Sequence, residues 1–214
     1  MSSLGSFLRR PLFGVDPRLT ALAIGYGFAL SVLVGVSGWR RKLFLSDGTM
    51  PPAVDFFSWL VILLAVLTTT LVPLGYALWN GGPATALFLA LAAHLSAGLV
   101  SGQLVADVDF TIALAVGALA ATVAVFREAV HRDSLRSPAV YPGFVDGLLV
   151  GTVPAILAAV GIYRLAGELG GHASLGFWLG TLGTVLAVAG LTGLWVLFFH
   201  KPSQSRQPTE QFGG

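Results

Sequence analysis

One histidine lies deep inside a long apolar stretch of this chain. No Asp, Glu, Lys or Arg occurs between Asp55 and Asp107, and His94 falls within that interval. An ionisable group in such a stretch is a candidate to carry a proton, to ligate a porphyrin metal or to contact a substrate. The alternative is a neutral imidazole that hydrogen-bonds to a neighbouring helix. Both interpretations of His94 remain open on the sequence alone.

Carboxylates mark the ends of the apolar stretches. A carboxylate at the start of a helix accepts backbone amides and opposes the positive end of the helix dipole. This explains the positions of Asp55, Asp109 and Asp146. The alternative is a cation or metal site built from several loops on the outer face, although the spacing does not demand one. Its candidate ligands are Asp107, Asp109, Glu168 and His172.

The residue inventory excludes several kinds of chemistry. The chain has no cysteine, so it forms no disulfide, thiolate metal site or cysteine nucleophile. A retinal Schiff base needs a buried lysine, and the two lysines, Lys42 and Lys201, both lie outside the apolar stretches. Twelve basic and ten acidic residues, scattered along the chain, do not favour nucleic-acid binding. A haem or another pigment at His94 is the cofactor hypothesis that remains.

A serine motif is similar to one in a protease family. The segment 35–38, GVSG, resembles the GxSG motif of rhomboid intramembrane proteases, and His94 falls two helices later, as that family's histidine does. In rhomboids the serine opens its helix, whereas Ser37 is expected at the end of one. An intramembrane enzyme centred on His94 is therefore a hypothesis without an evident second catalytic group.

Apolar helices must position these residues. The chain is 55% apolar and 10% charged, and its charge-free intervals are long enough to cross a bilayer. They are apolar on every face, which indicates helices and not a membrane barrel. The sequence predicts an all-α, polytopic membrane protein, a bundle of about six transmembrane helices with short loops. The expected spans are 19–39, 56–79, 83–103, 109–130, 146–165 and 175–200.

Turn chemistry and charge organise these spans. Asn-Gly-Gly-Pro at 80–83 predicts a tight turn between the second and third helices. Residues 1–18 are expected to form a cytoplasmic or interfacial segment, 19–200 the bundle, and 201–214 a polar cytoplasmic tail. Basic residues favour cytoplasmic termini, with the plasma membrane of a prokaryote as the expected location. In this orientation the inner residues are Arg9, Arg10, Arg18, Arg127, Arg132, Arg136, Lys201 and Arg206, and the outer ones Arg40, Arg41, Lys42 and Arg164.

Small residues recur at intervals of about four within the spans. Lipid tails supply no hydrophobic push between helices, so backbones approach most closely where small residues align. These rows are predicted helix-packing faces, either within this chain or against another subunit. Their members are Gly27, Ser31 and Gly35; Gly117; Gly143, Gly147, Gly151 and Ala155; and Gly176 and Gly180.

Two prolines interrupt predicted helices. Pro73 and Pro154 each remove a backbone hydrogen bond and are expected to kink their helices. In the second helix, the hydroxyls of Thr68, Thr69 and Thr70 are expected to satisfy the freed carbonyls. A proline in the middle helix of each half also resembles the inverted-repeat plan of secondary transporters, although simple kinks are the preferred interpretation.

Three classes of function remain. The first is a non-catalytic subunit that packs through its Gly/Ala faces in a larger membrane complex, or against a second copy, with lipid or pigment as a further ligand. The second is a small-solute transporter or its substrate-binding component. Gly27, Ser31 and Gly35 in the first of six helices resemble the docking rows of such components in energy-coupling-factor transporters. The third is the enzyme centred on His94. Sparse intramembrane polarity favours the first.

Overall fold

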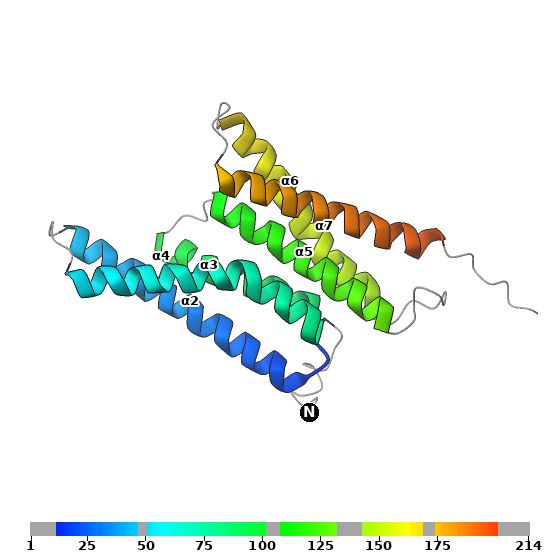
Figure 1. The fold of residues 1–214 in the computed structure, drawn as a ribbon, viewed down its shortest axis with the longest axis horizontal. Coiled ribbons are helices and arrows are strands. Elements are labelled where there is room, and N and C mark those ends of the chain that lie inside the picture. The colour runs from blue at the N-terminus through cyan, green and yellow to red at the C-terminus, as the bar shows by residue number, and fades with distance from the viewer. Residues whose placement is uncertain (1–11, 47–50, 102–107, 132–142, 169–173, 201–214) are drawn as a thin grey trace, which may run out of the picture.

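The computed structural model describes residues 12–46, 51–101, 108–131, 143–168 and 174–200, and within these ranges it is helical without a strand (Figure 1). Five helices are long and apolar enough to cross a membrane, and the apolar part of α4 is shorter. The predicted all-α membrane bundle is therefore confirmed. The helices are α2 (Pro17–Ser46), α3 (Pro52–Asn80), α4 (Pro83–Ser101), α5 (Val108–His131), α6 (Phe144–Glu168) and α7 (Leu175–His200).

Two central helices hold the bundle together. α5 packs against α3, α4, α6 and α7, and α4 packs against α2, α3, α5 and α6. α2 and α3 thus form one flank and α6 and α7 the other, as Figure 1 shows. In the part of the chain that the structure describes, α2 contacts α3 and α4, and α7 contacts α5 and α6. These two helices are therefore the edges of the bundle, and each leaves one side to its surroundings.

Small side chains fill the interior and large ones face outward. Alanines form much of the buried face of α5, and among them Ala113, Ala118 and Ala121 are fully buried. Leucine, valine and aromatic side chains cover the outside, where Leu22 is 71% and Trp79 80% exposed. In lipid this arrangement lets backbones approach one another and leaves the large side chains to acyl chains. The packing therefore matches the environment that the composition predicts.

Exposed tryptophans lie near both ends of α3. Trp59 and Trp79 stand twenty residues apart on one helix, which separates them by about 30 Å at the rise of an α-helix. That distance matches the hydrocarbon thickness of a bilayer, and tryptophan prefers the two interfaces that bound it. We call the end of the bundle that carries Trp79 and Asn80 the Asn80 end, and the opposite end the Trp59 end.

Some helices extend beyond the predicted spans. α2 runs from Pro17 to Ser46 and passes through Arg40, and α3 begins at Pro52. Basic side chains end a stretch that suits hydrocarbon, but they are good helix formers, so the helix continues past the apolar span. The turn expected at 80–83 is present, since α3 ends at Asn80 and α4 begins after two glycines.

The hydroxyls of Thr68 and Thr70 do not bond to the carbonyl that Pro73 frees, contrary to the prediction. Pro73 has no N–H and so leaves the carbonyl four residues earlier without its helical partner. Thr68 Oγ1 donates to Leu64 O at 2.8 Å. Thr70 Oγ1 donates to Val66 O at 2.7 Å. Both hydroxyls reach back one turn along their own helix, as helical threonines do, so neither bonds to the carbonyl that the proline frees.

Candidate functional site

His94 lies on α4 and faces α5. Its ring meets that of Phe110 edge-on, with 6.2 Å between the ring centroids. The imidazole is half-buried, and Ala90, one turn before it, is fully buried against Gly117 of α5. The histidine therefore takes part in the contact between the two central helices, and its role as a ligand for haem or pigment stays a prediction.

A hydrogen-bond network closes the Asn80 end of the bundle. The buried Asn80 side chain accepts the backbone N–H of Asp16 through Oδ1 at 2.7 Å. Its Nδ2 donates to Tyr76 OH at 2.8 Å and to Thr20 Oγ1 at 3.1 Å. The hydroxyls of Thr20 and Tyr76 lie 2.9 Å apart. One amide group thus ties the start of α2 to the end of α3.

The carbonyl of Phe13 is the second centre of this network. It accepts the hydroxyl of Tyr76 at 2.5 Å and that of Thr85 at 2.8 Å. Thr20 Oγ1 lies 3.0 Å from the same oxygen. Because Tyr76 belongs to α3 and Thr85 to α4, Phe13, which precedes α2, is bonded to two further helices.

The chain before α2 folds back onto the turn between α3 and α4. Val15 N–H donates to Asn80 O, and Ala84 N–H donates to Leu12 O, each at 2.9 Å. Ala84 lies in the first turn of α4, where an N–H has no acceptor within its own helix. The segment 12–16 supplies that acceptor and is therefore bonded to the end of the bundle, while the cytoplasmic or interfacial position of residues 1–18 stays a prediction.

Two glycines allow this close approach. Gly14 has φ of 132° and Gly82 has φ of 75°, a region that favours glycine. A Cβ at Gly14 would lie 2.4 Å from Asn80 Nδ2. A Cβ at Gly82 would lie 2.4 Å from Phe13 C. Both positions therefore require glycine for their backbone conformation and for the space that a side chain would take.

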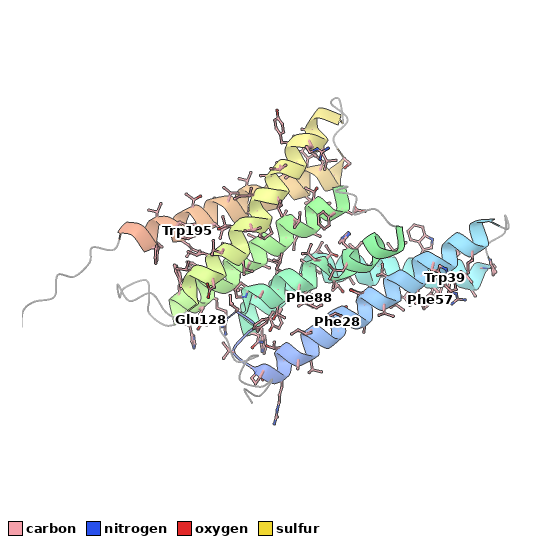
Figure 2. The ribbon with its side chains drawn as sticks, turned by 180° about the vertical axis from the view of Figure 1, so that it is seen from behind. Phe28, Trp39, Phe57, Phe88, Glu128 and Trp195 are labelled. Atoms are coloured by element: carbon pink, nitrogen blue, oxygen red, sulfur yellow. The ribbon has the colours of Figure 1, made fainter. Side chains whose placement is uncertain are left out.

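Arg127 of α5 binds the end of α3. Its Nη2 donates to Trp79 O at 3.0 Å, close to the negative end of the α3 dipole. Its Nη1 is buried and has no hydrogen-bond partner among the described residues. It lies 4.0 Å from the carboxylate of Glu128, which is itself buried at this end of the bundle (Figure 2). The hydrogen bond from Arg127 to Trp79 O thus joins α5 to the end of α3.

Little in the sequence marks this network. Asn80 carries a turn signal, and nothing in the sequence pairs Thr20 or Phe13 with residues 60 and 72 positions away. The one usable signal is the spacing of Tyr76 and Asn80, which stand four residues apart and therefore share a helix face within an otherwise apolar span.

The predicted small-residue rows of α2 and α5 lie against other helices of this chain. A Cβ at Gly27 would lie 2.4 Å from the ring of Phe88, which belongs to α4 (Figure 2). Ser31 Oγ of α2 donates to Ala92 O of α4. A Cβ at Gly117 would lie 2.6 Å from a leucine of α4. The backbones of these helices approach closely because no side chain separates them.

The small residues of α6 and α7 lie in similar contacts. A Cβ at Gly147 would lie 2.9 Å from a valine of α5, and one at Gly151 would lie 2.9 Å from Leu191 of α7. Gly180 faces α5, where a Cβ would lie 3.3 Å from an isoleucine. Ala155 is buried in the same core as Leu191. These contacts fix α6 and α7 on the surface of α5.

Other predicted positions have different surroundings. Gly143 has φ of 88° and directly precedes α6, so it serves the helix start. Gly35 and Gly176 are half-buried. Pro154 lies buried inside α6, as Pro73 does inside α3.

The acidic candidates lie at helix ends. Exposed aspartates occupy the first turns of α3, α5 and α6, where they oppose the helix dipoles, namely Asp55, Asp109 and Asp146. Over the five described ranges, no three His, Asp or Glu residues gather as a metal site. Asp107 and His172 lie outside the described residues, and Glu168 is the last residue of α6.

An apolar groove runs between α2 and α3 near the Asn80 end. It has a volume of about 440 Å³. Leu22 and Tyr26 line it from α2, Gly75 and Trp79 line it from α3, and Leu89 of α4 also borders it. Gly75 has no neighbouring atom within 4 Å of where a Cβ would be, which makes room on the α3 side.

α2 carries a second row of small residues on its outer side. Ala21, Gly25 and Ala29 recur at intervals of four and are exposed. A Cβ at Gly25 would meet nothing within 4 Å, whereas Gly27, two residues further, faces α4. We call Ala21, Gly25 and Ala29 the open row.

These features define an α-helical integral membrane protein whose described helices are joined by small residues and by polar contacts. Five apolar helices of membrane-spanning length place it in that class. Comparison with known proteins finds no matching family model, no matching curated protein and no matching solved structure.

Proposed function

We propose that the chain is a non-catalytic subunit of a larger membrane complex and that it binds a partner's transmembrane helix on the open row. The open row is the observation that carries this proposal. It is exposed on an edge helix, and small residues at intervals of four are the feature on which membrane helices approach most closely. The small residues that face inward already pack against other helices of this chain. The open row does not, so it is the small-residue face that another molecule can contact.

The polar contacts between helices support a structural role. Asn80 joins α3 to α2, and Ser31 joins α2 to α4. Trp195 Nε1 of α7 donates to Thr152 Oγ1 of α6 at 3.2 Å (Figure 2). Bonds of this kind hold helices in a fixed arrangement, which a packing subunit needs. The proposal includes cytoplasmic termini in a prokaryotic plasma membrane, supported by the distribution of basic residues.

Site-specific photo-cross-linking tests the open row. Because the chain has no cysteine, Ala29→Cys gives it a single thiol for a benzophenone maleimide, and the adducts are identified on the purified chain. Ala189→Cys is the matched control, because it is an exposed alanine on the opposite edge helix. In native membranes we expect the probe at Ala29 to cross-link one partner protein, and Gly25→Leu, in the same labelled chain, to abolish that adduct. The probe at Ala189 is expected to react with lipid alone.

Each other result contradicts the proposal. The same partner at both positions would mean that the open row has no special role. Cross-linking to a second copy of this chain would replace the larger complex by a homo-oligomer. Purification of the chain with a stoichiometric small solute, or with a visible absorption band that His94→Phe removes, would favour a transporter or a pigment-binding protein.

A further inference from the structure

The groove between α2 and α3 has the size and lining of a ligand site. Its volume of about 440 Å³ falls within the range of about 300–1,000 Å³ that small-molecule sites occupy. Its wall consists of aliphatic and aromatic side chains, and Gly75 leaves space where other residues of α3 project outward. Such a lining favours an apolar chain and gives a polar solute no compensation for its lost hydration.

The groove lies at the depth where a lipid's acyl chain meets its headgroup. One end is lined by Trp79, which is 80% exposed at the Asn80 end, and tryptophan in that position marks the membrane interface. From there the groove extends along α2 past Leu22 to Tyr26, toward the middle of the bilayer. An acyl chain that follows this path keeps its ester and phosphate groups beside the start of α2.

A cation stands at that start. Arg18 is exposed and lies one helical turn before Leu22, so the two side chains neighbour each other on the surface of α2. Helical side chains lean toward the N-terminus, which directs Arg18 toward the headgroup level. The nearby Asp16 uses Oδ1 to accept the Arg18 backbone N–H at 2.8 Å. The positive end of the α2 dipole lies at the same place.

A second arginine adds to the positive charge near Trp79. Arg127 holds the carbonyl of Trp79 at 3.0 Å, and its Nη1 makes no hydrogen bond with the described residues. Glu128 lies 4.0 Å from that nitrogen and partly balances the charge. Arg18 is exposed, so its side chain is open to an external anion, whereas Arg127 is bonded to Trp79 O and lies beside Glu128.

We propose that this groove binds one acyl chain of an anionic phospholipid and that Arg18 binds its phosphate. This proposal rests on one exposed arginine at the membrane interface beside an apolar groove. It goes beyond the role of the open row and does not depend on it, because Leu22, Tyr26 and Gly75 make the groove without Ala21, Gly25 or Ala29.

Quenching of Trp79 by brominated lipids tests the proposal. The purified chain is reconstituted in phosphatidylcholine vesicles that contain an equal fraction of brominated phosphatidylglycerol or brominated phosphatidylcholine. The Trp79 signal is the difference between the chain and its Trp79→Phe variant. We expect phosphatidylglycerol to compete about fivefold better, because one basic residue near an anionic lipid adds about 1 kcal/mol.

Matched variants separate the two parts of the site. Arg18→Gln is expected to remove the preference for phosphatidylglycerol, whereas Arg164→Gln, an exposed arginine at the Trp59 end, keeps it. Gly75→Leu fills the groove and is expected to reduce quenching by both lipids. Gly193→Leu, which also has open space around it, leaves quenching unchanged. Circular dichroism and thermal unfolding confirm that each variant is folded.

Several results would overturn the inference. Equal quenching by the two lipids would exclude recognition of the headgroup, and unchanged quenching in Gly75→Leu would exclude an acyl chain in the groove. Weak quenching by both lipids would mean that protein covers the groove, either a second copy or another chain. Loss of the preference in Arg164→Gln would assign it to overall charge.

Discussion

Replacing Asn80 with alanine tests whether one amide holds the Asn80 end together. The change leaves the backbone N–H of Asp16 without its acceptor, and an orphaned donor costs about 1–3 kcal/mol. It also removes the donor to Tyr76 and Thr20, and hydrogen bonds between membrane helices contribute about 0.6 kcal/mol each. Together these losses lower the free energy of unfolding by about 3 kcal/mol.

Equilibrium unfolding in mixed micelles, titrated with dodecyl sulfate and followed by circular dichroism, measures this difference. Tyr76→Phe removes the hydroxyl that bonds to Phe13 O and accepts from Asn80, and it is expected to cost about 1 kcal/mol. The double variant is expected to lose less than the sum of the two, because the pair shares a hydrogen bond. Thr192→Ala is the matched control, with an expected loss below about 0.5 kcal/mol, because its hydroxyl donates to Val188 O of its own helix.

The reasoning is refuted if Asn80→Ala behaves like Thr192→Ala, with a loss below about 0.5 kcal/mol. Water at the membrane interface would then be replacing the amide in its bonds to Asp16. Strict additivity of Asn80→Ala and Tyr76→Phe would show in turn that the two side chains stabilise the bundle independently. Either result would remove the network from the account of how α2 and α3 are joined.

Two further predictions follow from the packing and the charge distribution. Gly151→Leu is expected to lose about 3 kcal/mol, because a Cβ at this position would lie 2.9 Å from Leu191, whereas Gly193→Leu has open space and stays within about 0.5 kcal/mol of the parent in dodecyl sulfate unfolding. Equal losses would contradict the assigned contact. A green fluorescent protein fused after Gly214 is expected to fluoresce and alkaline phosphatase fused there to be inactive, because a cytoplasmic C-terminus is proposed; active phosphatase would reverse the orientation.

The number and position of the helices follow from the charge-free intervals, because hydrocarbon excludes charged side chains over the length of each span, and from the turn at 80–83 that divides the longest interval. The residues at which the helices end are less well predicted by the charge-free intervals. α2 continues through Arg40 to Ser46, since charge limits contact with hydrocarbon but does not break a helix. The turn after Asn80 is predictable because glycine and proline determine it locally.

The packing partners are beyond the reach of the sequence pattern. Gly25 and Gly27 stand two residues apart in the same helix, yet Gly27 packs against Phe88 and Gly25 faces outward. Nothing local distinguishes them, because the difference lies in which side of α2 the other helices occupy. The Asn80 network cannot be predicted from the sequence for the same reason, since Thr20 and Asn80 meet only through the tertiary fold. His94 stands out in the sequence because no other ionisable residue lies deep within a span, and the structure places its ring against Phe110 of α5.

The hydrogen bonds between the segment 12–16 and the turn after α3 have a consequence for biogenesis. Phe13 bonds to Thr85, and Leu12 bonds to Ala84, so the first residues find their partners only when a long stretch of later sequence has been synthesised. Until that stretch has emerged from the ribosome, the leading helix stays in the membrane with its beginning unanchored. A nascent chain arrested before Thr85 therefore lacks these hydrogen bonds, and they form once the arrest is released.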